Sequence, residues 1–88
     1  MMEYKVRFEK GARKSLKKMD PHQSRIIMGW INKNLMGTSN PRQHGKALTH
    51  NHSCKWRYRV GDYRLIANIN DKEITILVLE IDHRRNIY

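Results

Sequence analysis

Cations alternate with aromatic and aliphatic residues in the segment KWRYRVGDYRLI, and this spacing points to phosphate binding. If its Gly-Asp pair forms a two-residue turn, Arg59 lies directly opposite Arg64, and Arg57 lies two residues further along the same face of the hairpin. Directly opposed like charges destabilise a sheet, but a phosphate placed among planar guanidinium groups accepts paired hydrogen bonds from them. The hairpin therefore predicts a surface for a polyanion, with a simply solvated basic exterior as the alternative.

The C-terminal segment HRRNIY supplies the other groups that cleavage of RNA requires. His83 can give or take a proton near neutral pH, Arg84 and Arg85 add guanidinium groups, and Tyr88 adds a phenol. The 2′-hydroxyl of RNA can itself attack the adjacent phosphate, so an enzyme has to position that phosphate, stabilise its growing negative charge and move two protons. We therefore expect a metal-free ribonuclease site in which this segment continues the arginine-bearing face of the hairpin.

The remaining potential metal ligands do not form a metal-binding pattern. His44, His50 and His52 fall in one segment, but no carboxylate stands at ligand spacing and Cys54 is the only cysteine. A single thiol builds neither a thiolate metal site nor an internal disulfide. We expect neither a metal nor a cofactor, and we expect the histidines to be exposed loop residues or contacts to nucleic acid.

The composition limits both the fold and the partner. The chain has 88 residues, enough for a single domain that spans positions 1–88 and buries one modest core. Its 18 Lys and Arg residues against 8 Asp and Glu residues give a formal net charge of +10, which favours nucleic acid as a partner ahead of an acidic protein or an anionic membrane surface. No apolar run reaches the roughly 20 residues of a membrane span and no signal-peptide pattern begins the chain, so we expect a cytoplasmic protein without a membrane partner.

Hydrophobic periodicity predicts an α+β fold with a small, mainly antiparallel sheet and an N-terminal helical hairpin packed on one face. Alternating apolar residues indicate a strand first, two apolar stripes at helical spacing follow, and three further strands joined by short turns form a meander. The expected strands are residues 3–9, 55–60, 63–69 and 74–81, and the expected helices begin at Lys10 and at Pro21. Residues 36–53, rich in Gly, Ser, Asn and His, are expected to form a long loop. The resulting order is β-α-α-β-β-β.

Almost the whole chain resembles the RelE branch of the RelE/ParE toxin superfamily. The likeness rests on the segments ARKSLKKM, PRQHGKAL, WRYRVGDYRLI and HRRNIY, of which the hairpin and the C-terminal motif are specific and the helical segment is not. The resemblance implies a RelE-like fold and the toxin of a type II toxin–antitoxin system, an mRNA interferase that enters the ribosomal A site and cleaves the codon there by the 2′-hydroxyl route. A ParE-like toxin that poisons DNA gyrase without cutting RNA is the alternative.

The resemblance also implies a role for each matching residue. Arg57 and Arg59 fall where the family holds the scissile phosphate or helps to protonate it, and Arg64 falls where the family stabilises the pentavalent phosphorane. Arg84 matches the arginine at the end of the last strand, and Tyr88 matches the tyrosine that stacks on a base or orients it. Further cations are expected to bind RNA: Lys46, Lys55 and Arg85.

Proton transfer and partners follow from the same likeness. His83 occupies the place of a catalytic histidine in some relatives and is assigned as the general acid. Such relatives often pair it with a loop carboxylate, but Lys46 stands near that place, so the base is a neutral His83, Tyr88, Glu80 or no dedicated group. The expected partners are a RelB-like antitoxin whose acidic or amphipathic segment covers the basic face, the ribosome with its mRNA, and operator DNA reached only through the antitoxin.

Overall fold

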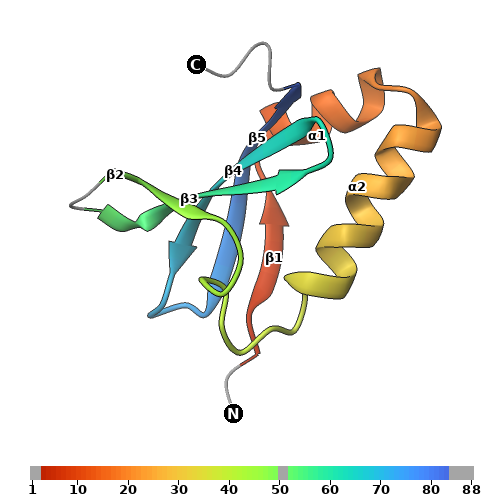
Figure 1. Cartoon of the computed structure of the whole chain (residues 1–88). Helices are drawn as coiled ribbons and strands as arrows, with labels where there is room; N and C mark the ends of the chain where they lie inside the picture. Colours follow the sequence, from red (N-terminus) through yellow and green to blue (C-terminus); the bar gives the residue numbers. More distant parts are fainter. Residues whose placement is uncertain (1–2, 50–51, 84–88) are drawn as a thin grey trace.

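Two helices lie on one face of a single five-stranded sheet in the computed structural model of the chain (Figure 1). The model describes residues 3–49 and 52–83. Its strands are β1 (Lys5–Phe8), β2 (Lys46–Thr49), β3 (His52–Val60), β4 (Tyr63–Asn70) and β5 (Thr75–His83). Its helices, α1 (Lys10–Lys18) and α2 (Pro21–Asn34), both follow β1 in the chain. The fold is α+β, as the sequence predicts.

The strands lie side by side in the order β1-β5-β4-β3-β2. As predicted, β3, β4 and β5 form an antiparallel meander. β1 pairs in parallel with β5, with Val6 opposite Ile76, so the first and the fifth strand of the chain are neighbours in the sheet. The sheet is therefore mixed, with β5 in its interior.

The ends of α2 are set by local sequence. The Asp20 carboxylate accepts a hydrogen bond of 3.0 Å from the backbone N–H of His22, and Pro21 occupies the first turn, where its missing N–H costs nothing. The helix ends at Asn34, and Gly37 follows with φ of +77°, a conformation that favours glycine. These caps place the start of α2 next to the end of α1, where the Ser24 hydroxyl donates to the carbonyl of Leu16 at 2.6 Å.

The core lies between the helices and the sheet. Ile27, Ile31 and Leu35 project from α2 and its C-cap and are fully buried against residues from the facing side of β3, β4 and β5. The sheet contributes Tyr58, Val60, Leu65, Ala67, Ile69, Ile76, Val78 and Ile81. These residues alternate along each strand with residues that point to the opposite face, apart from one bulge in β5. Burial of this side fixes which residues face away from the helices.

The long loop expected at residues 36–53 is in part a strand. β2 pairs antiparallel with β3 over Lys46 and Ala47, which lie opposite Arg57 and Trp56, and β3 itself begins at His52. The four residues of β2 carry too short an alternation to be recognised in sequence, and their strand conformation comes from pairing with β3. The strand that the sequence did not predict matters for function because β2 brings Lys46 beside Arg57. Within the described residues no helix is long and apolar enough to cross a bilayer.

Candidate nucleic-acid interface

The hairpin of β3 and β4 has the register that the sequence predicts. Val60 pairs with Tyr63 across the Gly-Asp turn, and Arg59 pairs with Arg64. Arg57 pairs with Ile66, two residues further from the turn. Because opposed residues in antiparallel strands share a face, all three arginine side chains leave the sheet on the side away from the helices.

Arg64 is the most enclosed cation of this group. Its residue is only 9% exposed, whereas Arg59 is exposed and Arg57 is half-buried. Asp82 of β5 lies opposite Arg64 on the other side of β4, so one row across the sheet reads Arg59, Arg64, Asp82. A guanidinium group keeps its charge even when enclosed, and its attraction for an anion rises where water is excluded. If a phosphate lies on this face, as the sequence predicts, Arg64 would attract it more strongly than an exposed arginine would.

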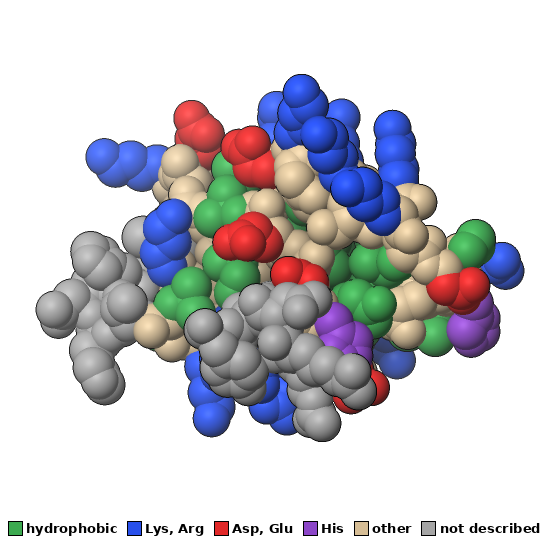
Figure 2. Space-filling view, turned by 90° about the horizontal axis from the view of Figure 1, so that it is seen from above, with side chains coloured by type: hydrophobic (Ala, Val, Ile, Leu, Met, Phe, Trp, Pro, Cys, Tyr) green, Lys and Arg blue, Asp and Glu red, His purple; other side chains and the backbone are tan. Residues whose placement is uncertain are grey.

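A second row of charged residues runs beside the first. Lys46 of β2 lies opposite Arg57, Arg57 lies opposite Ile66, and Ile66 lies opposite Glu80 of β5. Lys55 lies one row further on, opposite Asn68. We define the arginine face as the surface formed by five predicted phosphate-binding residues: Lys46, Lys55, Arg57, Arg59 and Arg64. Seen from the end of the molecule that carries the hairpin turn, Lys and Arg side chains project around most of the outline, with a few acidic side chains set between them (Figure 2).

His83 does not join the arginine face, contrary to our expectation. It pairs with Tyr63, the two rings stand 5.4 Å apart at 80°, and the imidazole lies in a hollow lined by Ser15, Lys18 and Met19 of the α1 region. That hollow is on the helix-bearing face of the sheet. The structure thus separates the predicted general acid from the three arginines, and the catalytic role of His83 stays a prediction.

A β-bulge in β5 explains this placement. Ala67 pairs with Val78 and Ile66 pairs with Glu80, so Leu79 is an extra residue without a partner of its own. In a regular strand, every second residue from the buried Ile76 would face the helices, and His83 would then face the arginines. The extra residue, Leu79, reverses this alternation for all residues of β5 that follow it. Glu80 and Asp82 point to the arginine face instead. Of the groups considered as a general base, Glu80 is the one that the described structure brings there.

Three predicted site residues lie outside the described residues, namely Arg84, Arg85 and Tyr88, and His50 lies outside them as well. His44 is described and packs its ring against Trp30, with ring centres 5.8 Å apart. Across residues 3–49 and 52–83, no group of three or more His, Cys, Asp or Glu side chains is placed to hold a metal ion.

Comparison with known proteins identifies the family. Residues 6–88 match the family described as the ParE toxin of the type II toxin–antitoxin system parDE. Toxin RelG of Mycobacterium tuberculosis is 33% identical over 87 residues, which cover 99% of this chain and 98% of that protein. The chain belongs to the RelE/ParE toxin family. It is a RelE-like toxin of the type II toxin–antitoxin class.

Solved structures of relatives share the fold of this toxin. The toxin–antitoxin complex RelBE2 from Mycobacterium tuberculosis contains a chain with a TM-score of 0.80 and 32% identity, covering 93% of this toxin and 99% of that chain. The intact RelBE complex of E. coli contains a chain with a TM-score of 0.72 and 17% identity, covering 91% and 95% respectively. The latter likeness is one of fold alone.

The toxin also contains a surface hydrogen-bond network that sequence reasoning missed. Arg42 donates two hydrogen bonds to the Asp71 carboxylate, of 3.1 Å and 3.0 Å, and the Tyr4 hydroxyl donates to the same carboxylate at 2.7 Å. The hydrogen bonds from Arg42 and then Tyr4 lower the pKa of Asp71 below its ordinary value. The bond to Asp71 raises the pKa of Tyr4, because it favours the protonated phenol. Positions so far apart in the chain carry no local signal that would pair them.

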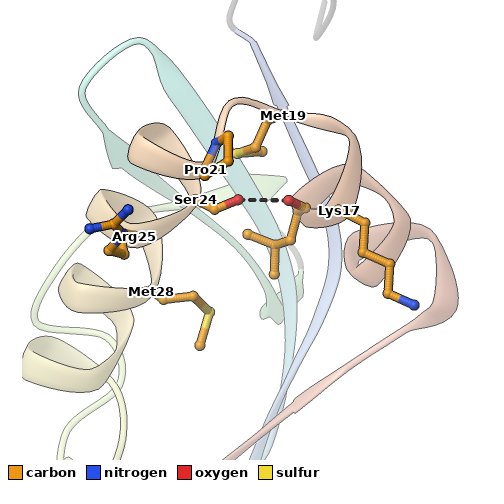
Figure 3. A pocket seen from close by; sticks show the side chains of 7 residues that line it. Lys17, Met19, Pro21, Ser24, Arg25 and Met28 are labelled. Atoms are coloured by element: carbon orange, nitrogen blue, oxygen red, sulfur yellow. Dashed lines mark hydrogen bonds between the residues drawn. The ribbon is translucent and has the colours of Figure 1, made fainter.

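A separate groove lies between the two helices of the toxin (Figure 3). It has a volume of about 310 Å³, and Leu16, Met19 and Met28 supply its apolar lining together with Pro21. The charged side chains that line it are Lys17 and Arg25. None of the residues predicted for RNA cleavage lines the groove, so it is distinct from the arginine face.

Proposed function

We propose that this toxin is an endoribonuclease that cleaves mRNA in the ribosomal A site through attack of the RNA 2′-hydroxyl on the adjacent phosphate. The observation that carries the proposal is the register of the hairpin, which sets Arg59 opposite Arg64 with Arg57 on the same face. This arrangement is costly for an isolated protein and favourable once a phosphate lies among the three groups. Its chemistry needs no protein nucleophile and no metal.

Each arginine has a distinct part in the proposed reaction. Arg57 and Arg59 hold the scissile phosphate through its oxygens, and Arg59, being exposed, can follow the phosphate as it approaches. Arg64, enclosed between Arg59 and Asp82, stabilises the extra negative charge of the phosphorane. The preorganised charge of an enclosed group stabilises a transition state without reorganisation of water.

Proton transfer is assigned by position on the sheet. Glu80 and Asp82 reach the arginine face through the bulge in β5 and are the carboxylates nearest in register to Ile66 and Arg64. Removal of the 2′-hydroxyl proton is therefore assigned to this strand, in preference to the helix-facing His83. Arg84 and Tyr88 keep the places that the resemblance gives them, Arg84 as the arginine at the end of the last strand and Tyr88 as the tyrosine that stacks on a base or orients it.

We further propose a RelB-like antitoxin as the partner that silences the toxin. The related chains in the RelBE2 and E. coli RelBE structures are in complexes with antitoxins. A formal net charge of +10 calls for an acidic covering segment, and such a segment would block the arginine face to RNA. The toxin then acts in the cytoplasm on ribosomes and reaches operator DNA only through the antitoxin.

A second candidate function comes from the family match itself. The matching family carries the description of ParE, and a ParE-like toxin would act on DNA gyrase. That activity would make no use of guanidinium groups gathered around a phosphate. Loss of the arginines would then leave toxicity unchanged.

Cleavage of a reporter mRNA in a reconstituted translation system, read by mapping 5′ ends, tests the proposal. We expect cuts only when ribosomes are present, and we expect Arg64→Ala to slow cleavage by about 10²–10³-fold, the usual cost of removing one preorganised charge donor. Arg59→Ala gives a second test at an exposed position. Lys33→Ala, which removes an exposed cation from α2, is the matched control and should cleave at the wild-type rate. Growth arrest with intact transcripts and broken DNA would establish the gyrase alternative instead.

A further inference from the structure

Residues 37–45, which connect α2 to β2, are held at their beginning by Tyr4. The backbone N–H of Gly37 donates to the Tyr4 carbonyl at 2.9 Å, and the backbone N–H of Tyr4 donates to the carbonyl of Thr38 at 2.9 Å. The connection then passes along the end of the sheet that lies opposite the Gly-Asp turn (Figure 1). Tyr4 is itself buried, and its hydroxyl is bonded to Asp71. The start of the connection is thereby tied to the sheet.

The middle of the connection is tied to the turn between β4 and β5. Arg42 and Asp71 meet in a two-pronged ion pair, in which each terminal nitrogen of the guanidinium donates to one carboxylate oxygen. This geometry fixes orientation as well as distance. The side chains are 27% and 56% exposed, and ion pairs exposed to water contribute little to stability. Their main effect is therefore on where the connection lies.

The end of the connection is tied to β3. The buried Tyr58 hydroxyl donates to the Pro41 carbonyl at 2.5 Å, and Trp56 Nε1 donates to the His44 carbonyl at 2.6 Å. The Arg42 guanidinium carbon also lies 5.9 Å from the centre of the Trp56 ring. Trp56 and Tyr58 flank Arg57 in the chain and point to the other face of the sheet. The hydrogen bonds of Trp56 and Tyr58 thus join the connection to the part of β3 that carries Arg57.

Gly45, the last residue of the connection, packs closely against the backbone of Arg57. A Cβ at this position would lie 2.2 Å from the Arg57 carbonyl oxygen, and the residue has φ of +80°. The next residue, Lys46, is paired with Arg57. The Arg42–Asp71 pair holds this connection in place, and the connection leads directly into Lys46. We infer that the pair thereby affects where Lys46 lies relative to Arg57.

We propose that Arg42 and Asp71 are positioning residues, which hold Lys46 beside Arg57 so that the two cations bind one RNA phosphate together. The inference rests on the proposed nuclease function for its catalytic consequence. Lys46 belongs to a strand of four residues that has a strand neighbour only in β3 within the described sheet. Such a strand depends on its connection for its placement. The acidic partner of Arg42 thus acts on RNA through Lys46, without itself touching the substrate.

A double-mutant cycle on the cleavage rate tests the proposal. We expect Lys46→Ala and Arg42→Gln each to slow ribosome-dependent cleavage by about 10-fold or more, since small displacements of a positioning group carry costs of this size. The double variant should be no slower than Lys46→Ala alone, because Arg42 acts through Lys46. Effects that multiply to about 100-fold, or a Lys46→Ala variant with the wild-type rate, would overturn the proposal.

Hydrogen exchange supplies a readout that does not depend on nuclease activity. In Arg42→Gln we expect faster exchange of backbone amides in residues 42–49, with β4 and β5 unchanged, and we expect none of this in the charge-matched control Lys33→Gln. Unchanged exchange at Lys46, or faster exchange throughout the chain, contradicts the proposal. Asp71→Asn provides the same test if Arg42→Gln does not fold. If wild-type toxin cuts no RNA while exchange behaves as expected, the proposed function fails and the positioning of Lys46 stands.

Discussion

Replacement of Arg59 by threonine tests whether the guanidinium groups near the Gly-Asp turn repel each other in the folded toxin. Arg59 and Arg64 are opposed across β3 and β4, so their Cβ atoms are separated by about 4.5–5.5 Å. Two unit charges about 5 Å apart repel each other by about 0.8 kcal/mol in the dielectric of bulk water, and by more where water is excluded from one of them, as it is at Arg64. Asp82, on the far side of Arg64, offsets part of this repulsion. The pair should therefore cost about 0.5 kcal/mol of stability, within the usual range for cross-strand pairs.

We accordingly expect Arg59→Thr to be more stable than the wild type while binding RNA less tightly. The gain of about 0.5 kcal/mol corresponds to a rise in melting temperature of about 2–4 °C for a domain of this size. Lys55→Thr is the matched control, because it removes the same charge from the same face of β3 but faces Asn68. The assay is thermal unfolding of both variants in about 10 mM and about 1 M salt, where the Debye lengths are about 30 Å and about 3 Å.

The reasoning is refuted if Arg59→Thr is no more stable than Lys55→Thr at low salt. It is also refuted if the difference between the two variants survives unchanged at high salt, since a Coulomb repulsion has to be screened there. Binding of Arg59→Thr to a short RNA should be weaker than that of the wild type and should depend less on salt, because one phosphate contact is lost.

Three further outcomes are expected. Tyr58→Phe should lower the free energy of unfolding by about 1–3 kcal/mol in urea titrations, because a buried carbonyl loses its donor; an unchanged midpoint would contradict this. Gly45→Ala should cost at least about 1–3 kcal/mol through its positive φ and the overlap with Arg57, with Gly29→Ala as a harmless comparison. The fold lowers the pKa of Asp71 below its ordinary value of 3.8. The wild type should therefore exceed Asp71→Asn in free energy of unfolding by a constant amount above pH 3.8, and this excess should shrink as the pH falls through the folded pKa. An excess that grows in acid would contradict the prediction.

Sequence was sufficient for the hairpin and for the helix ends because both depend on neighbours in the chain. The two-residue turn alone fixes which residue faces Arg59. The cap at Asp20 and the glycine after α2 mark that helix without reference to the rest of the fold. The alternation of side chains along β3 also predicts that Tyr58 points into the core, and Tyr58 is fully buried.

The placement of His83 and the existence of β2 could not be read in this way. Leu79, the extra residue of the bulge, is apolar like its neighbours in β5. Nothing in the local sequence therefore shows that the alternation of side chains between the two faces of the sheet reverses there. The strand conformation of β2 depends on its pairing with β3, which follows it in the chain. Both features are decided by pairing between strands, and both alter which groups surround the RNA.

The pairing of β1 with β5 has a consequence for the synthesis of the toxin. Residues 5–8 leave the ribosome first, yet the strand that they pair with comprises residues 75–78, near the opposite end of the chain. Closing so long a segment is the slow part of assembling a sheet. A nascent chain that still lacks β5 has neither the partner of β1 nor the strand that lies beside Arg64, so the sheet is completed only after residues 75–83 have been made.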